Sequence, residues 1–507
     1  MAALAIADGN GAALGNCMKR TWRVRGWVIV AILGVLGAAG GLLAYNTFFR
    51  EEPAAYFESD EDHFLYGSVG TEGQEGIPYW IWLVLPRIFP EYLPEPGGWA
   101  SLGVQSTPGR EMPVGLSKVT IGFPRVAINC AICHTTSVRT TPGGPVTLVP
   151  GGTSNRMSPQ QYLRFLMACG SDPRFTADVI LAEIAKNHQL SAYERLVYRF
   201  VIIPRTRQGL LEVKERESWM DANPDWGRGR IDPFNQVKYR YLKQPKDMTI
   251  GNSDMMPLWN LATRQGPGRA FHWDGLNTDL REVVISSAIG DGTPVSWVER
   301  DMAKWGNTDR RDQSSLRRIY DYIGRLQPPR YPLPIEASLS QQGAALYKTH
   351  CASCHEIGAK RTGTIIPVEE VGTDRHRLDM WTRAAADSYN VLSEGYSWRM
   401  SKFQKTGGYL SAPLDGLWLR GPYLHNGSVP TLADLLEPAA ARPTLFWRGY
   451  DLLDPVKVGF VSTGPEAEAT GSRHDTSVPG NSNAGHEYGT TLSAGEKRAL
   501  VEYMKTL

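Results

Sequence analysis

The sequence predicts a mainly α fold with long irregular loops, preceded by one N-terminal transmembrane helix. Residues 26–45 form an uncharged, mostly apolar run. Helical spacing of apolar residues recurs in several later segments, whereas no later region is rich in strand patterns. The chain also has 52 glycines and 34 prolines, an excess that favours loops. At roughly 150 residues per domain, the 507 residues correspond to about three units.

The composition excludes several classes of protein. A hydrophobic fraction of 42% with 10% aromatic residues rules out a disordered chain. The formal net charge of +2 lacks the basic excess of a nucleic-acid binder, so we expect no nucleic-acid partner. A mean hydropathy of −0.30 excludes a polytopic membrane protein. The six cysteines are too sparse for a disulfide scaffold.

The apolar run at 26–45 has the properties of a membrane anchor. As an α-helix, its 20 residues span roughly 30 Å, the thickness of a hydrocarbon core. Basic residues precede it and acidic residues follow, so the positive-inside rule makes 1–25 a cytoplasmic basic tail and 26–46 the anchor. We expect a single-pass inner-membrane protein with its soluble domains in the periplasm. A cleaved signal peptide is the alternative, although its apolar region would span only about 7–15 residues.

The soluble part divides into two predicted domains. Residues 60–326 form an N-terminal domain and residues 335–507 a C-terminal domain, joined by the Pro-rich linker 327–334 (QPPRYPLP). Prolines make the segment 78–99 loop-rich, because they forbid long helices.

Helical patterns occur in both predicted domains. Ser158 and Pro159 have the residue types of an N-cap and a first helical position, so a helix is predicted from there through Met167. Ser493 and Glu496 match a capping box at the start of the last helix. The remaining predicted helices cover 176–187, 191–203, 312–325, 339–350 and 492–507.

Two copies of C-x-x-C-H, Cys130–His134 and Cys351–His355, form the c-type haem attachment signature. Cysteines three apart lie near one face of a helical turn, so both can reach the vinyl groups of one porphyrin. The next histidine is then placed to ligate the iron. A Cys₄ zinc site is the alternative, but zinc pairs do not require a following histidine. The motifs therefore predict two covalently bound haem c groups, attached through Cys130, Cys133, Cys351 and Cys354, with His134 and His355 as iron ligands.

The other two cysteines carry no such motif. Cys17 precedes the apolar run and Cys169 follows it, so the membrane would separate them and they could not pair. Cys169 follows Leu166 and Met167 and is expected to be a buried apolar residue.

The sixth ligand of each iron decides between electron transfer and chemistry at an open position. For the second haem, His486 lies on a loop shortly before the last helix and is the first candidate. His425, in GPYLHNGSVP, is the second candidate, and either histidine could instead bind a propionate. Weaker candidates are Met400, Met380, His376 and His474.

The first haem has no convincing sixth ligand, because residues 135–187 contain no histidine. His188 lies in a helical, Lys-flanked context typical of a surface residue, and His272 and the pair Met255–Met256 lie in no recognisable ligand loop. We therefore expect an open iron there. Trp273, beside His272 in the turn FHWDG, could lie between two porphyrins.

At these positions the sequence resembles the bacterial di-haem cytochrome c peroxidase superfamily, and within it most closely the rubber-oxygenase-like branch. The matching segments are GFPRVAINCAICHT (122–135), DMMPLWNLATR (254–264), AFHWDG (270–275) and GPYLHNGSVPTLADLLEP (421–438). The resemblance implies two cytochrome c-like domains, with a catalytic N-terminal haem and an electron-transfer C-terminal haem. It also implies that Trp273 lies between the haems and that the C-terminal haem has two histidine ligands.

Two departures from that family are visible. The distal histidine that peroxidases place soon after the first motif is missing, which argues against a standard peroxidase cycle. An anchored chain is also unlike the secreted, soluble rubber oxygenases, which argues against a bulky polymer substrate.

The sequence thus predicts a haem oxidoreductase, peroxidase-like, that reduces hydrogen peroxide or activates dioxygen at the first haem. His134, His272 and Trp273 are the candidate catalytic residues. Electrons would arrive through the second haem from a redox partner such as a small cytochrome or a cupredoxin. A pure electron carrier with both irons six-coordinate is one alternative, and an alkene-cleaving oxygenase is the other.

Overall fold

The computed structural model describes residues 11–507, with side-chain surroundings from residue 27 onward. The chain forms a smaller unit, which runs up to Pro53 and includes Val119–Pro124, and a larger unit of Ala54–Lys118 with Arg125–Leu507. Helices make up 44% of the chain and strands 11%. The prediction of a mainly α protein is therefore confirmed.

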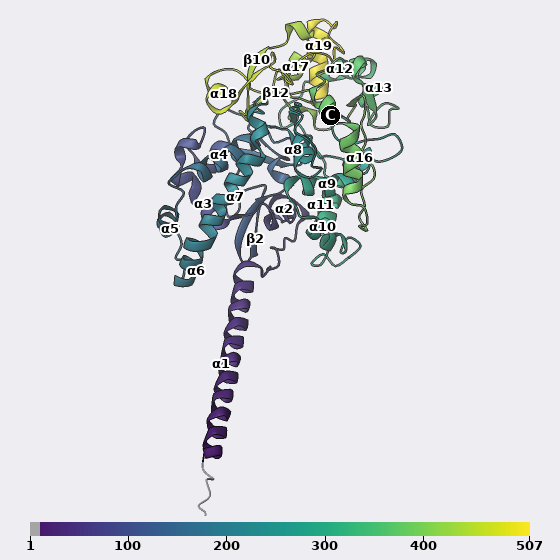
Figure 1. The fold of residues 1–507 in the computed structure, drawn as a ribbon. Helices are drawn as coiled ribbons and strands as arrows, with labels where there is room; N and C mark the ends of the chain where they lie inside the picture. Colours follow the sequence, from purple (N-terminus) through teal and green to yellow (C-terminus); the bar gives the residue numbers. More distant parts are fainter. Residues whose placement is uncertain (1–10) are drawn as a thin grey trace, which may run out of the picture. The chain divides into compact units, whose positions relative to one another are not determined.

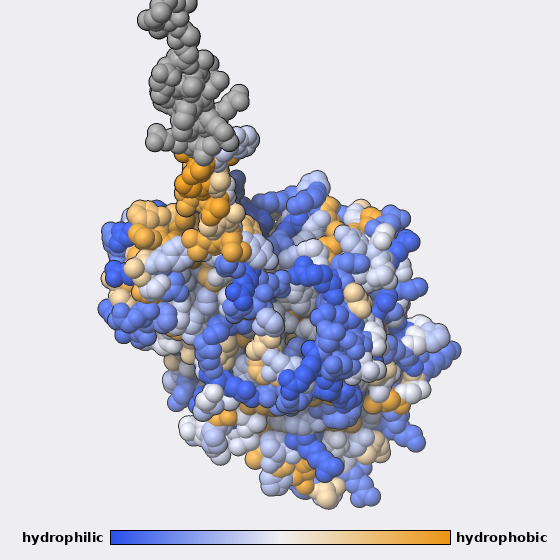
Figure 2. Space-filling view, turned by 90° about the horizontal axis from the view of Figure 1, so that it is seen from below, coloured by the Kyte–Doolittle hydropathy of each residue, from blue (hydrophilic) through white to orange (hydrophobic). Residues whose placement is uncertain are grey.

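The smaller unit contains the long apolar helix that the sequence predicts. Helix α1 spans Gly11–Phe48, and its part Trp27–Phe48 has a mean hydropathy of 2.3 with none of its surface buried (Figures 1 and 2). By length and composition this helix can cross a membrane, and a signal sequence would have the same properties. Of the predicted tail 1–25, residues 1–10 lie outside the described residues. The side chain of Cys17 is likewise not described.

The larger unit is built mainly from short helices joined by long loops (Figure 1). Helices of its first half are α2 (Asp60–Tyr66), α3 (Tyr79–Ile88), α4 (Pro159–Ser171), α5 (Ala177–Ile184), α6 (Ala192–Val197), α7 (Ile203–Arg216), α8 (Pro233–Arg240), α9 (Leu280–Asp291), α10 (Val295–Met302) and α11 (Ser315–Arg325). Those of its second half are α12 (Ala337–His350), α13 (Ala352–His355), α14 (Val368–Val371), α15 (His376–Met380), α16 (Arg383–Leu392), α17 (Leu432–Leu435), α18 (Pro465–Thr470) and α19 (Ala494–Met504).

The strands are short and pair in small antiparallel ribbons. The pairs are β1 (Ile77–Pro78) with β3 (Phe123–Ile128), β4 (Thr135–Val138) with β5 (Thr147–Pro150), β6 (Arg230–Ile231) with β7 (Ser253–Asp254), β8 (Ile365–Pro367) with β9 (Gly408–Leu410), β10 (Leu445–Arg448) with β13 (Ser472–Asp475), and β11 (Leu453–Asp454) with β12 (Gly459–Phe460). Strand β2 (Leu116–Ile121) completes a three-stranded sheet in the order β1-β3-β2.

Several helix predictions agree with the structure and others need correction. Helix α19 begins with the predicted capping box, in which Ser493 accepts from the Glu496 N–H and Glu496 accepts from the Ser493 N–H. Helix α4 does start at Pro159, but the Ser158 side chain makes no capping hydrogen bond. The helix expected to end at 203 continues through a π-helical segment, Tyr198–Ile202, into α7.

A further correction concerns the segment 78–99, where the ten-residue helix α3 replaces part of the expected loop. Pro86 fits inside this helix because it lies in the last turn, where its missing N–H removes a single backbone hydrogen bond. Burial of Ile81, Trp82 and Leu85 then outweighs this loss.

Two hydrophobic cores of the larger unit combine residues from both sides of the Pro-rich segment 327–334. One core combines α9 and α11 with residues of α16 and the loop after it, including Tyr389 and Trp398. Another combines α12, α17 and α19 with Val138, Val149 and Trp259 from the first half. Residues on both sides of the predicted linker therefore share each core, and the division into 60–326 and 335–507 stays a prediction.

Helices α12 and α19 pack side by side in the second core and bring the second C-x-x-C-H motif against the end of the chain (Figure 1). Gly343 allows this close approach, because a Cβ atom there would overlap the backbone carbonyl of Ala499. A side chain at this position would force the helices apart.

Gly343→Ala should lower the free energy of unfolding by about 2 kcal/mol or more, because backbone atoms of α19 cannot move as a flexible side chain could. Urea unfolding followed by circular dichroism measures this change. Gly495→Ala is the matched control. It also replaces a glycine inside a helix by alanine, but a Cβ atom at residue 495 meets nothing within 4 Å. Equal stability of the two variants would contradict the packing role of Gly343.

Candidate functional site

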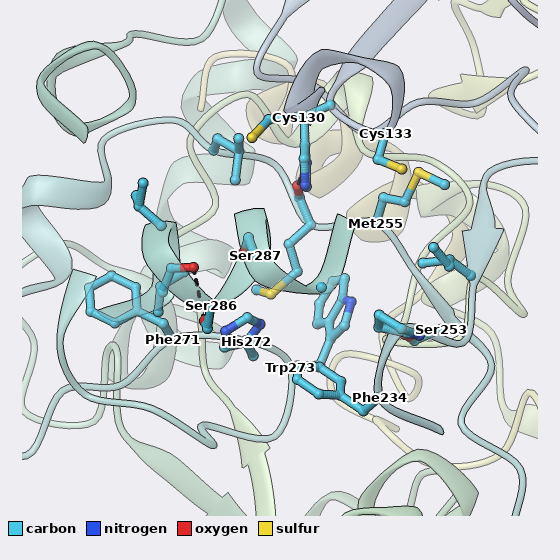
Figure 3. Close-up of a pocket in the computed structure, with 18 of the residues that line it drawn as sticks. Cys130, Cys133, Phe234, Ser253, Met255, Phe271, His272, Trp273, Ser286 and Ser287 are labelled. Carbon is cyan, nitrogen blue, oxygen red and sulfur yellow. Dashed lines mark hydrogen bonds between the residues drawn. The ribbon is translucent and has the colours of Figure 1, made fainter. Parts of the chain in front are cut away.

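A large cavity opens beside the first C-x-x-C-H motif, with a volume of about 1410 Å³ including its mouth. Cys130, Cys133 and His134 line it from the 3₁₀ turn Cys130–Ile132 and the residues directly after that turn. Figure 3 shows the two cysteines on one side of this first cavity, with Phe271, His272 and Trp273 on the other. Further walls come from α8, α9, α11 and the segment 253–258.

A second cavity of about 1360 Å³, including its mouth, is built in the same way. Cys351, Cys354 and His355 line it from the end of α12 and from α13, and His425 and His486 line it from later loops. The two cavities thus have nearly equal size, and each receives one complete C-x-x-C-H motif.

The two cavities share a wall of Asp254, Met255, Pro257 and Trp273. Trp273 donates its Nε1–H to the backbone carbonyl of Asp254 at 2.6 Å, which fixes the indole in the wall that the two cavities share. The Asp254 carboxylate is buried and forms an ion pair with Arg448, itself buried. Burial raises the pKa of Asp254 to about 6, although Arg448 and Arg230 act in the opposite direction.

Each motif histidine is oriented by a backbone carbonyl. His134 Nδ1 lies 2.8 Å from the carbonyl oxygen of Met256, and His355 Nδ1 lies 2.7 Å from that of Ala412. Since a carbonyl only accepts, each Nδ1 carries the proton and each Nε2 keeps its lone pair free. Burial lowers the pKa of His134 to about 4 and also lowers that of His355, which keeps both rings neutral. A neutral imidazole with one free lone pair is the form that binds iron.

His486 faces His355 across the second cavity, with ring centres 6.1 Å apart. Two imidazoles on opposite sides of one metal ion, each bonded at about 2.0 Å, would have ring centres about 6.3 Å apart. His425 lines the same cavity but stacks on Tyr409, with ring centres 4.0 Å apart and an angle of 20° between the planes. The spacing of His355 and His486 therefore suits a shared metal ion.

The first cavity differs in its second histidine. His272 lines it and makes an edge-to-face contact with Phe234 at 5.5 Å. Its Nε2 is buried without a hydrogen-bond partner among the described residues, and burial lowers its pKa to about 3. Within the described part of the chain, no ring contact joins His134 to a second histidine as His355 is joined to His486.

Of the seven non-glycine residues with positive φ in the described part of the chain, two are candidate histidines and one directly precedes a third. His272 has φ +65° and His486 has φ +51°, and Leu424, just before His425, has φ +69°. Non-glycine residues rarely adopt this left-handed conformation, and it occurs most often where function fixes a side chain. The strain marks these loops as sites where side-chain position matters more than backbone stability.

Sequence reasoning missed several polar residues of the cavity walls. Arg377 is buried, pairs with Asp274 at 3.3 Å, and lies with its guanidinium 4.6 Å above the Phe234 ring. The Asp291 carboxyl lines the first cavity without an ion-pair partner among the described residues, and burial raises its pKa to about 7. An arginine or aspartate outside any motif gives no signal in the sequence, so these residues could not have been found there.

The remaining candidates lie away from the walls of both cavities. Met380 and Met400 are buried in the core around α9 and α16. The others make local contacts: His376 with Asp374, His474 with Phe446, and His188 stacked on Trp80. Cys169 is fully buried, as predicted. Within the described residues, no group of three or more His, Cys, Asp and Glu side chains is placed to hold a metal ion on its own.

These observations test whether the cavities fit haem c. Covalent attachment of haem c adds a cysteine thiol across a vinyl group of the porphyrin. Burial raises the pKa of Cys130, Cys133 and Cys351, so these cysteines stay in the thiol form. A neutral imidazole with a free Nε2 stands beside each thiol pair. The walls are predominantly apolar, as a porphyrin requires. The residues fit, and they are those expected of a cytochrome c-like protein.

Comparison with known proteins agrees with this class. Residues 408–448 match the family model described as RoxA-like, cytochrome c-like. This segment contains Tyr409, Ala412 and His425 of the second cavity. Near its C-terminus the chain is therefore similar to RoxA-like cytochrome c, and this similarity implies covalently bound haem c and suggests a haem oxidoreductase.

Two relatives come from Sinorhizobium fredii (strain NBRC 101917 / NGR234). The uncharacterized protein y4iJ is 25% identical over 475 residues, which cover 75% of this chain and 77% of the relative. The uncharacterized protein y4iM is 29% identical over 339 residues, which cover 56% of this chain and 72% of the relative.

Arg448→Met should lower the free energy of unfolding by about 3 kcal/mol at pH 7.5, because the substitution leaves the Asp254 carboxylate buried and without its ion-pair partner. The variant raises the Asp254 pKa above its present value of about 6. The folded state then holds that proton still more tightly relative to the unfolded chain, so stability falls more steeply than in the wild type as pH rises from 5 to 8.

Urea unfolding at pH 5 and pH 7.5 measures this difference. Arg473→Met serves as the control, since Arg473 is largely exposed and its pair with Asp475 contributes little. If Arg448→Met lowers the free energy of unfolding by the same amount at pH 5 and pH 7.5, the ion pair with Asp254 is not the cause of the loss.

Proposed function

We propose that this chain is a membrane-anchored, periplasm-facing oxidoreductase with two haem c groups, one in each cavity. The N-terminal haem would react with hydrogen peroxide or dioxygen, and the C-terminal haem would supply electrons from a small cytochrome or cupredoxin. The observation that carries this proposal is the pair of nearly equal cavities, each lined by one C-x-x-C-H motif and both lined by Trp273.

The residues of the second cavity support an electron-transfer site. His355 and His486 both line the second cavity with ring centres 6.1 Å apart, so the chain itself would supply two histidines to hold the C-terminal haem through its iron. A closed iron of this kind favours electron transfer over binding of a substrate.

The residues of the first cavity support an open site. His134 would hold the N-terminal haem from one side, and the apolar side chains Phe234, Phe271 and Val284 would exclude bulk water. Haem bound there supplies an iron that exchanges electrons with peroxide or dioxygen. Ligand specificity would then depend on the few polar groups of this cavity.

Two of those polar groups can form hydrogen bonds with a substrate or exchange protons with it. His272 is neutral at physiological pH, and its Nε2 can accept a hydrogen bond from a substrate hydroxyl or donate one to a substrate oxygen. The Asp291 carboxyl has a pKa raised to about 7, so it can both give and take a proton near neutral pH. These groups would take the place of the distal histidine that the sequence lacks at 135–187.

Trp273 would act as the relay between the haems. Its indole lines both cavities, and its hydrogen bond to the Asp254 carbonyl holds the ring in one orientation. The Arg448 ion pair fixes Asp254 in turn. A rigid aromatic ring between two redox groups shortens the gap that an electron must cross.

The match to RoxA-like cytochrome c favours a second candidate, an oxygenase that cleaves an apolar alkene. The first cavity offers an apolar lining of Phe234, Phe271, Val283, Val284, Ile319 and Ile323, which suits such a substrate. Both reactions need the same open iron, and they differ in the second reactant.

Carbon monoxide binding tests the open first site. The ferrous protein should show a carbon monoxide shift for one haem per chain, and His486→Ala should add a second. A Cys130→Ser/Cys133→Ser variant should lose the shift and half of the covalent haem, whereas Cys351→Ser/Cys354→Ser should lose half of the haem and keep the shift. A wild-type protein that binds no carbon monoxide would have both irons closed, and the chain would then be an electron carrier.

Trp273→Phe should slow electron transfer between the haems at least roughly tenfold while leaving both attached, because it removes the indole and its 2.6 Å hydrogen bond. Flash photolysis of the carbon monoxide complex measures the rate. The control is Trp80→Phe, whose ring stacks on His188 away from both cavities. Unchanged transfer in Trp273→Phe would reject the relay.

A further inference from the structure

A polar pocket lies apart from both haem cavities and shares no wall residue with either among the described residues. Helix α4, strands β6, β10 and β13, and the segment 225–228 form its walls. We call it the arginine pocket, because five arginines line it. Its residues are Pro94, Gln160, Gln161, Arg164, Asp225, Trp226, Gly227, Arg228, Arg230, Arg448, Gly471, Ser472, Arg473, His474 and Asn481.

Several buried polar atoms of the arginine pocket have no hydrogen-bond partner within the described part of the chain. They are Trp226 Nε1, Gln160 Nε2, Arg230 Nε and His474 Nε2. All four side chains belong to residues exposed by 2% or less. The amide of Gln160 is held in one orientation, because its Oε1 accepts the backbone N–H of Trp226 at 2.9 Å. Three N–H donors of residues that line one pocket are therefore left unsatisfied, and each such group needs a partner.

Arg230 is the unusual member of this set. Its Nη1 donates to Asn481 Oδ1 at 2.7 Å and its Nη2 to the Gly480 carbonyl at 3.4 Å, both uncharged acceptors. Among the described residues, it forms no ion pair with a carboxylate. A buried guanidinium without a counter-ion is costly, and burial lowers its pKa to about 9.

The carboxylates near Arg230 are already engaged. Asp254 and Asp374 act on it electrostatically, but Asp254 pairs with Arg448 and Asp374 binds His376. The other arginines of the pocket have carboxylate partners of their own: Arg164 with Asp221 and Asp225, Arg228 with Glu95, and Arg473 with Asp475. Arg230 is therefore the one arginine of the pocket that no carboxylate contacts among the described residues.

We propose that the arginine pocket binds a small oxyanion of carboxylate or phosphate type, with Arg230 as its counter-ion and Trp226 and Gln160 as hydrogen-bond donors. Such an anion has several acceptor oxygens, which match the three unsatisfied donors. Water could satisfy the donors but would leave the Arg230 charge without a partner. The proposal rests on this pocket alone and does not depend on which reaction the haem sites perform.

Binding of inorganic phosphate and of acetate to the full-length holoprotein tests the proposal. Isothermal titration at constant ionic strength in chloride should show saturable 1:1 binding of at least one of them. Phosphate alone would identify a phosphate-type site, and acetate alone a carboxylate-type site. Absence of saturable binding for both anions would overturn the proposal and leave the pocket to water.

Variants locate the bound anion. Trp226→Phe keeps the ring and removes one donor, so it should weaken binding roughly 5- to 10-fold. Arg230→Gln should weaken it roughly 10- to 100-fold or abolish it. Arg310→Gln, which alters an exposed arginine outside the pocket, should leave binding unchanged. If wild type and Trp226→Phe bind the anion equally well, the anion is not bound in the arginine pocket as proposed. This conclusion holds even if Arg230→Gln does not fold.

Discussion

The hydrogen bond from each motif histidine to a backbone carbonyl is the interaction on which both cavities depend. His134 and Met256 are 122 residues apart in the chain, and His355 and Ala412 are 57 apart. Each bond therefore ties a local attachment motif to a distant segment, and only the folded chain can supply the acceptor. Because the acceptor fixes the tautomer, the fold decides which ring nitrogen is free for a metal.

The carbonyl of Met256 also connects this interaction to the shared wall. Met255 and Asp254 precede it directly and line both cavities, and Asp254 holds Trp273. Arg448 reaches this wall from β10 and pairs with Asp254 while also donating to the carbonyl of Gly427. One short segment, 254–256, thus orients the histidine of the first C-x-x-C-H motif, anchors the proposed relay and carries the buried ion pair that links the segment to the C-terminal half.

Much of this site could be predicted because its signals are local. The attachment motifs, the capping box of α19 and the apolar helix each occupy a short stretch of sequence. Features made by distant segments could not be seen in the sequence: the sharing of core residues across 327–334, the positions of Asp291 and Arg377 in the wall of the first cavity, and the uncharged partners of the Arg230 guanidinium. Helix α3 was missed for a different reason, since burial of its apolar face outweighed the proline that argued against it.

The left-handed backbone at His272 and His486 also has an evolutionary consequence. Glycine at either position would relieve roughly 1–2 kcal/mol of strain and would remove the ring nitrogen at the same time. Stability alone would therefore favour glycine over histidine at both positions. A lineage that no longer used one cavity should lose its strained histidine before it loses the cysteines, since those add no comparable strain.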